Sequence, residues 1–144
     1  MTKLTSDQIS KNMKANKSSG TKPELLLAKT LWKMGLRYRK NDKRVFGKPD
    51  LTFFKHKIAI FVDGEFWHGK DWNIHKYDIK SNKEFWITKI ERNMARDNEV
   101  NKKLKESGWT VLRFWGKDIQ KHLILYTKMI EKVIYEKKIH ENRK

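Results

Sequence analysis

The sequence has no cysteine and only two prolines among its 144 residues, and acidic side chains are outnumbered two to one by basic ones. Without cysteine, neither a disulfide framework nor a thiolate zinc site can form, so we expect a reducing, cytoplasmic setting. The longest uninterrupted apolar run, Ile58 to Val62, is far shorter than the roughly 20 residues that cross a bilayer. No apolar segment follows Met1, so we expect neither a membrane span nor a signal peptide.

What is present is basic charge together with many aromatic side chains. The formal net charge is +17, and 38% of the residues are hydrophobic, including six Trp, seven Phe and four Tyr. This is too much apolar surface for a disordered basic tail, and the length suits one folded domain. A surplus of this size indicates a polyanionic partner. A solvated surface or a ribosomal-type RNA binder would explain the charge alone equally well.

The order of the apolar segments predicts an α/β protein with a mixed sheet. Between a basic arm at residues 1–20 and a basic tail at 139–144, residues 21–138 are expected to form a single domain. The predicted elements are a helix over 21–35, an antiparallel hairpin of runs 51–54 and 58–62, a functional loop over 64–83, a long helix over 82–106, a strand over 109–115, and one final amphipathic helix whose apolar residues run from 119 to 134.

Acidic side chains are expected to converge where the hairpin opens. A turn near His56 places Asp50 opposite residue 62 or 63, so that Asp50 and Asp63 meet beside His68. Two carboxylates and a main-chain carbonyl such as that of Val62 can bind a hard divalent cation, and Mg²⁺ is the usual one next to a phosphodiester. The alternative, equally weighted on these residues alone, is that both aspartates are turn residues.

Other residues near this point also allow two interpretations. His68 has a side chain suited to acid-base catalysis, although a lone histidine is more often not catalytic. Phe66 and Trp67 either fill the core under the loop or act as a wedge that unstacks DNA bases. Glu24 completes a predicted capping box with Thr21, or reaches inward to the hairpin.

Two polar residues of the long helix, Asn93 and Asp97, fall on its apolar stripe. Polar groups in such a position need hydrogen-bond partners. They either tie the helix to neighbouring backbone or support the active site.

Several short motifs occur in an order and spacing that are specific only in combination. They are Ser10-Lys11-Asn12-Met13-Lys14-Ala15, Gly47-Lys48-Pro49-Asp50, Phe61-Val62-Asp63-Gly64-Glu65-Phe66-Trp67-His68-Gly69, Phe85-Trp86 with Lys89-Ile90 and Asn93, Arg96-Asp97, and Gly108-Trp109-Thr110-Val111-Leu112. In these motifs, from about residue 8 to residue 118, the chain resembles the very-short-patch repair (Vsr) DNA mismatch endonucleases.

The resemblance implies a restriction-endonuclease-like core, a mixed β-sheet flanked by helices, that nicks one DNA strand 5′ of T in a T:G mismatch with Mg²⁺ as cofactor. In that family Asp50 matches the metal-binding aspartate, the main-chain oxygen of Val62 a metal ligand, and His68 the catalytic histidine. Glu24 matches an acidic residue near the site. The matched DNA contacts are the aromatics Phe66 and Trp67, and Met13 in the arm. Lys11 and Lys14, beside Met13, are also expected to bind DNA.

Two positions depart from the family pattern. Asp63 stands where some members have a second histidine, and a carboxylate there would more naturally bind or position the metal. Many members also have a structural zinc site, but the corresponding positions here hold Glu65, Lys70 and Trp72. We therefore expect no structural zinc, with the loop held by packing of Trp72 and Tyr77.

The sequence thus predicts a Mg²⁺-dependent phosphodiester hydrolase with Asp50, Asp63, His68 and Glu24 at the catalytic site and Asp50, Val62 and Asp63 at the metal. It is expected to act as a monomer on double-stranded DNA in the cytoplasm, associated with the nucleoid. The alternatives are a restriction-type nuclease that cuts matched duplex DNA, and a DNA-binding module without catalysis.

Overall fold

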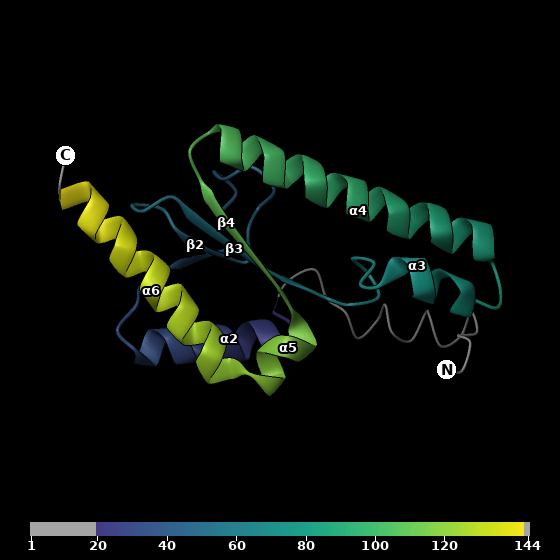
Figure 1. The fold of residues 1–144 in the computed structure, drawn as a ribbon, viewed down its shortest axis with the longest axis horizontal. Coiled ribbons are helices and arrows are strands. Elements are labelled where there is room, and N and C mark those ends of the chain that lie inside the picture. Colours follow the sequence, from purple (N-terminus) through teal and green to yellow (C-terminus); the bar gives the residue numbers. More distant parts are fainter. Residues whose placement is uncertain (1–19, 143–144) are drawn as a thin grey trace.

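The sheet has four strands and mixed polarity. The computed structural model describes residues 20–142, and Figure 1 shows helices on both sides of the sheet. The strands, in spatial order, are β1 (Arg39–Lys40), β2 (Leu51–Phe53), β3 (Ile58–Asp63) and β4 (Thr110–Trp115). Neighbouring strands are antiparallel except β3 and β4, which are parallel. The predicted α/β class, the hairpin and the strand near residue 110 are confirmed.

The central strand β3 is buried on both faces, as its unbroken apolar sequence predicts. Ile58 and Ile60 pack in one cluster with residues of the helices on one side, and Ala59 and Phe61 pack in another cluster with α4 on the other side. The first layer contains α2 (Lys22–Lys33), α5 (Gly116–Lys121) and α6 (Leu123–Asn142), and the second contains the long helix α4 (Lys83–Glu106) (Figure 1).

Helix α4 lies in the connection between the parallel strands β3 and β4. Parallel neighbours cannot be joined by a tight turn and need a long crossover of this kind. Its buried residues are Trp86, Ile90, Val100 and Leu104, which follow the apolar stripe that the sequence predicts. The crossover carries Asn93 and Asp97 along the same side, toward the end of β3. The fold therefore brings the middle of α4 to the site described below.

The predicted capping box at the start of α2 is wrong in detail. The Thr21 side chain makes no capping hydrogen bond. The Glu24 carboxylate instead accepts a hydrogen bond from the backbone N–H of Gly20 at 2.8 Å, one residue before the position that a capping box requires. Glu24 is almost fully buried, with 2% of its surface exposed, so it also faces the interior.

The segment 64–83, predicted as an unpacked functional loop, contains the short helix α3 (Trp72–His75) and the 3-10 turn η1 (Lys76–Asp78). Its apolar residues Trp72 and Ile79 form a buried cluster with Trp86 and Ile90 of α4. The predicted packing role of Trp72 is confirmed, whereas Tyr77 is 59% exposed. The apolar residues of this segment have no regular spacing, because the residues that they pack against lie on α4. The packing was therefore not predicted.

The final helix is also different from its prediction. Helix α5 ends at Lys121 and α6 begins at Leu123, with His122 between them in a non-helical conformation. The apolar spacing continues across the break because Ile119 of α5 and Ile130 of α6 enter the same core cluster. Helix α6 extends to Asn142, so residues 139–142 of the predicted tail are helical. Among the described residues, no helix is long and apolar enough to cross a membrane.

Candidate active site

Asp50 and Asp63 lie at the same end of the sheet, because Asp50 immediately precedes β2 and Asp63 ends the antiparallel strand β3. The predicted register is wrong by at least one residue. Leu51 pairs with Ile60, which centres the turn between Lys55 and His56. In this register the residue opposite Asp50 is Phe61, rather than residue 62 or 63. The Asp50 carboxylate nevertheless reaches Val62, whose backbone N–H donates to Asp50 Oδ2 at 2.7 Å.

The environment of Asp50 strongly disfavours its charged form. Burial raises the pKa of Asp50 to about 7, and the nearby negative charges of Glu24 and Asp63 act in the same direction. The hydrogen bond from Val62 and the nearby His68 only partly oppose this rise. An ionised Asp50 beside two other acids therefore requires positive charge close by.

His68 lies between two carboxylates. Its Nδ1 is 2.6 Å from Asp97 Oδ2 on α4, and its Nε2 is 3.8 Å from Asp63 Oδ1. Burial by itself lowers the pKa of His68, but the Asp97 hydrogen bond and the charges of Asp63 and Asp97 outweigh it and raise the pKa above the usual value. A carboxylate can only accept, so Nδ1 carries the proton and donates it to Asp97. The neutral ring then keeps the lone pair of Nε2 available as a base.

Asp63 is bound to an arginine that the sequence analysis did not single out. Arg113 on β4 donates from Nη1 to both carboxylate oxygens of Asp63, at 3.0 and 3.1 Å. Burial raises the pKa of Asp63, and the charges of His68 and Arg113 oppose this rise. The one clue in the sequence was a charged residue within the apolar run 109–115, because a charge in a covered strand needs a partner.

The loop that follows β3 is tied down by its own polar residues. Glu65 accepts from the backbone N–H of Lys117 at the start of α5, at 3.1 Å. Asn93 donates from Nδ2 to the carbonyl of Trp67 at 3.1 Å, which is the backbone tie predicted for one of the two polar residues of the α4 stripe. Asp97 follows the other prediction, because it contacts His68.

The two aromatic residues before His68 are half-buried. Phe66 and Trp67 pack on the cluster around Trp86, so they cover the core under the loop. Trp67 also lines the groove that holds the acids, and Lys89 Nζ lies 5.4 Å from the centre of its ring. The wedge remains a prediction, as does the DNA contact of Met13, Lys11 and Lys14, which lie outside the described residues.

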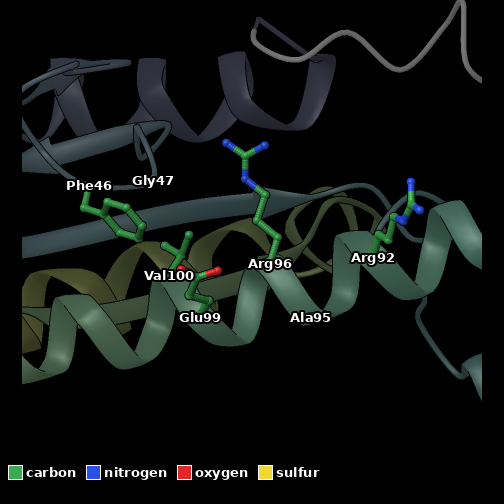
Figure 2. A pocket seen from close by; sticks show the side chains of 7 residues that line it. All are labelled: Phe46, Gly47, Arg92, Ala95, Arg96, Glu99 and Val100. Atoms are coloured by element: carbon green, nitrogen blue, oxygen red, sulfur yellow. The ribbon is translucent and has the colours of Figure 1, made fainter.

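One groove of about 550 Å³ collects the predicted site residues of the described part of the chain, with the exception of Phe66. Its lining includes Glu24, Asp50, Val62, Asp63, Trp67 and His68. A second hollow of about 380 Å³, shown in Figure 2, shares Gly47, Arg96 and Val100 with this groove and adds Arg92 and Phe46. In Figure 2 the side chains of Arg92 and Arg96 extend from the same side of α4. The acids of the groove thus lie next to a basic flank, formed by Arg92 and Arg96 of α4.

A four-stranded mixed sheet flanked by helices, with acids and a histidine gathered where β3 ends, is consistent with the restriction-endonuclease-like class of nucleases. The chain matches the family model described as DNA mismatch endonuclease Vsr over residues 1–74. It belongs to the Vsr family and is a DNA endonuclease, that is, a phosphodiester hydrolase.

Similar proteins come from several bacteria. The chain is 63% identical over 138 residues to the type II nicking enzyme V.HpaIIP of Haemophilus parainfluenzae, with 95% of this chain and 98% of that protein covered. It is 56% identical over 137 residues to V.NmeDIP of Neisseria meningitidis serogroup C, covering 95% and 93%. Identity to the DNA mismatch endonuclease Vsr of Escherichia coli K12 is 37% over 106 residues, covering 74% and 67%.

Proposed function

We propose that this chain nicks one strand of double-stranded DNA 5′ of the T in a T:G mismatch, with Mg²⁺ as its cofactor. The observation that carries the proposal is the single groove in which Asp50, Asp63 and Glu24 lie beside the paired His68 and Asp97. Carboxylates beside a phosphodiester are unfavourable unless a cation lies between them. The groove therefore suits a metal-dependent hydrolysis of DNA.

The donor set around Asp50 fits Mg²⁺. Asp50 has one hydrogen-bond donor among the described residues, the N–H of Val62, and is surrounded by acids. We assign Asp50 and the main-chain oxygen of Val62 as ligands; Asp63 lies next to them but its oxygens are engaged by Arg113. When bound, the ion would stabilise negative charge on the phosphoryl oxygens and acidify a water molecule.

His68 is the general base of this proposal. Asp97 fixes the ring through Nδ1, so Nε2 can accept a proton from the attacking water. The imidazolium that results is stabilised by the Asp97 and Asp63 carboxylates, at 2.6 and 3.8 Å in the structure. Glu24, buried at the same end of the groove, adds negative potential that favours occupation of the metal position.

We propose that the basic flank holds the DNA backbone and that Phe66 and Trp67 open the duplex, helped by Met13, Lys11 and Lys14. A base pair that is already poorly paired costs less to unstack, which would favour the mismatch. Of the relatives described above, two bear the name nicking enzyme and one the name mismatch endonuclease, which supports single-strand cleavage at a mismatch. We further propose that the enzyme acts as a monomer in the cytoplasm.

The test is cleavage of strand-labelled duplexes that contain a T:G mismatch or its matched parent in several flanking sequences, with Mg²⁺ or with EDTA. A single Mg²⁺-dependent nick on the T strand of the mismatch alone is expected. Equal cutting of matched DNA would instead indicate a restriction-type nuclease. Asp50→Ala is the control, and strong cleavage by this variant would contradict the assignment of the metal site.

A further inference from the structure

Phe46 is a large aromatic side chain that the loop before β2 presents to solvent. Its surface is 47% exposed, although the residues on either side of it are fixed by packing. Val45 is buried in the cluster between β3 and α4, and a Cβ at Gly47 would overlap the side chain of Val100 on α4. The backbone on both sides of Phe46 is thus pressed against the core, which holds the ring in one place at the surface.

A cation contacts the Phe46 ring from outside the hollow of Figure 2. Lys103 Nζ lies 4.6 Å from the centre of the ring and 3.2 Å from Glu99 Oε1. Such a contact is attractive and favours one orientation of the ring. Phe46 lines the hollow and Lys103 does not, so part of the exposed surface of the ring faces the hollow.

The hollow, of about 380 Å³, combines the contacts that one nucleotide of DNA requires. Its lining is small or apolar at Gly47, Ala95 and Val100, cationic at Arg92 and Arg96, and acidic at Glu99, whose charge Lys103 balances. Figure 2 shows Phe46 at one end, with Arg96 and Arg92 following along α4. A guanidinium binds phosphate oxygens, and an aromatic ring offers a flat apolar surface to a base or a sugar.

We propose that this hollow is a subsite for one nucleotide of the bound DNA, next to the phosphate that is cleaved. Arg92 and Arg96 bind the phosphates of this nucleotide, and Phe46 packs against its apolar part, base or sugar. The hollow and the acidic groove share Gly47, Arg96 and Val100, so a strand that passes Asp50 continues into the hollow. The position of the cleaved phosphate rests on the proposed function.

Phe54 has the same exposure without the hollow, and therefore serves as the matched control. It is also 47% exposed, and its ring also contacts a cation, with the guanidinium carbon of Arg44 4.3 Å from its centre. Phe54 lines neither the hollow nor the acidic groove. Exposure and a cation contact alone thus do not distinguish the two rings, whereas the hollow does.

The first test is equilibrium binding of the full chain to a labelled duplex with a T:G mismatch, in EDTA and over a range of salt concentrations. Phe46→Ala should weaken binding about fivefold or more at every salt concentration. The slope of log Kobs against log salt should stay unchanged, because no charge is lost. Phe46→Trp should recover most of the affinity, and Phe54→Ala should bind within about twofold of the wild type.

Ala95→Leu tests the same subsite without changing Phe46. Ala95 is exposed on α4, and leucine is also a good helix former, so the larger side chain fills the hollow while the helix is kept. This variant should also weaken binding with an unchanged salt slope, and it decides the question if Phe46→Ala does not fold. Undiminished binding by Ala95→Leu, or equal binding by Phe46→Ala and Phe54→Ala, would overturn the inference.

The second test locates the nucleotide. Nucleotides on either side of the cleaved phosphate are replaced one at a time, by an abasic residue or by a three-carbon linker that lacks both base and sugar. The difference in affinity between the wild type and Phe46→Ala should disappear at one position. Disappearance with the abasic residue identifies a base on Phe46, and disappearance with the linker alone identifies a sugar. A difference that persists at every position would refute the subsite.

The two proposals fail independently, because binding is measured in EDTA and needs no cleavage. Equal cutting of matched and mismatched DNA, or cutting without Mg²⁺, contradicts the proposed function even where Phe46 depends on one nucleotide. A Mg²⁺-dependent nick at the mismatch, together with a Phe46→Ala variant that binds as the wild type does, refutes only the subsite.

Discussion

Asp50 is costly to the metal-free fold because its charge is buried beside Glu24 and Asp63. Its carboxyl has a pKa of 3.8 when unfolded and about 7 when folded, so the folded state holds an extra proton between these values. The stability that this proton contributes is complete below pH 4 and is lost as the pH rises through 7. We expect Asp50→Asn to stabilise the metal-free protein at pH 8 by about 1 kcal/mol or more, and much less at pH 4.

The measurement is thermal unfolding of both proteins in EDTA at the two pH values. Added Mg²⁺ should reverse the order at pH 8, since a ligand stabilises only the protein that binds it. An Asp50→Asn variant less stable than the wild type in EDTA at pH 8 would show that the ionised Asp50 carboxylate does not destabilise the metal-free fold.

The contact between Asp97 and His68 supports a second prediction for a single residue. Asp97→Asn removes the charge that orients the imidazole and favours its protonated form, so we expect kcat to fall about 100-fold or more. Because Asp97 raises the pKa of His68, the acid limb of the pH-rate profile should move to lower pH in the variant. Asp78→Asn, which disrupts the partly buried pair with His75 at 3.1 Å, away from the groove, is the control and should leave both unchanged.

Single residues also show how far the sequence could be interpreted. Hairpin geometry was enough to predict that Asp50, Asp63 and His68 meet, because a short turn joins the two strands that follow Asp50 and end at Asp63. Arg113 contacts Asp63 across fifty residues of sequence, through a parallel pairing that no local spacing reveals. Arg113 could therefore be identified as the partner of Asp63, a predicted metal ligand, only from the structure.

Among the elements, the turn after His68 depends on a glycine. Gly69 has φ of +72°, and a Cβ there would overlap the side chain of Met94 on α4. Gly69→Ala should therefore destabilise the fold by about 2 kcal/mol or more, through left-handed strain and overpacking together. Gly35→Ala is the matched control, with φ of +88° and nothing within 4 Å, and should cost about 1 kcal/mol. Equal losses in urea unfolding would refute the tight contact between loop and helix.

Helix α4 carries the basic flank, and the positions of its two arginines predict a contribution to DNA binding. Arg92 and Arg96 are one turn apart and both exposed, so each can neutralise a phosphate. The double Ala variant should reduce the slope of log Kobs against log salt by about 1.8 and weaken binding to all duplexes alike. Ala at Lys128 and Lys132, an exposed pair with the same spacing on α6, is the charge-matched control and should have little effect. Similar losses in both variants, measured without metal, would contradict the assigned flank.

Elements with a strong period were predictable, and those held by distant partners were not. The stripe of α4 and the apolar runs of β2 and β3 indicate their own boundaries to within one or two residues. Segment 64–83 has no period because its buried residues, Trp72 and Ile79, pack against α4. The break at His122 was likewise hidden, since α5 and α6 contribute to one core with unbroken apolar spacing.

For the whole molecule, the division into an arm and a domain is the remaining prediction, and deletion of residues 1–19 behind a new Met tests it. The described clusters pack the sheet between α4 and the helices α2, α5 and α6, so the midpoint of thermal unfolding should move by no more than about 4 °C. The deletion removes four lysines and one aspartate, which lowers the formal charge from +17 to +14, and the salt slope of DNA binding should fall by up to about 3.6.

Loss of Met13 should also reduce the preference for mismatched over matched DNA at least tenfold, because unstacking would then rest on Phe66 and Trp67 alone. Met13→Ala in the full chain separates this contribution from charge, since it should lower the mismatch preference without changing the salt slope. A truncated protein that no longer unfolds cooperatively would show that the arm is part of the domain. A truncated protein with undiminished mismatch preference would show instead that discrimination resides entirely in the groove between β3 and α4.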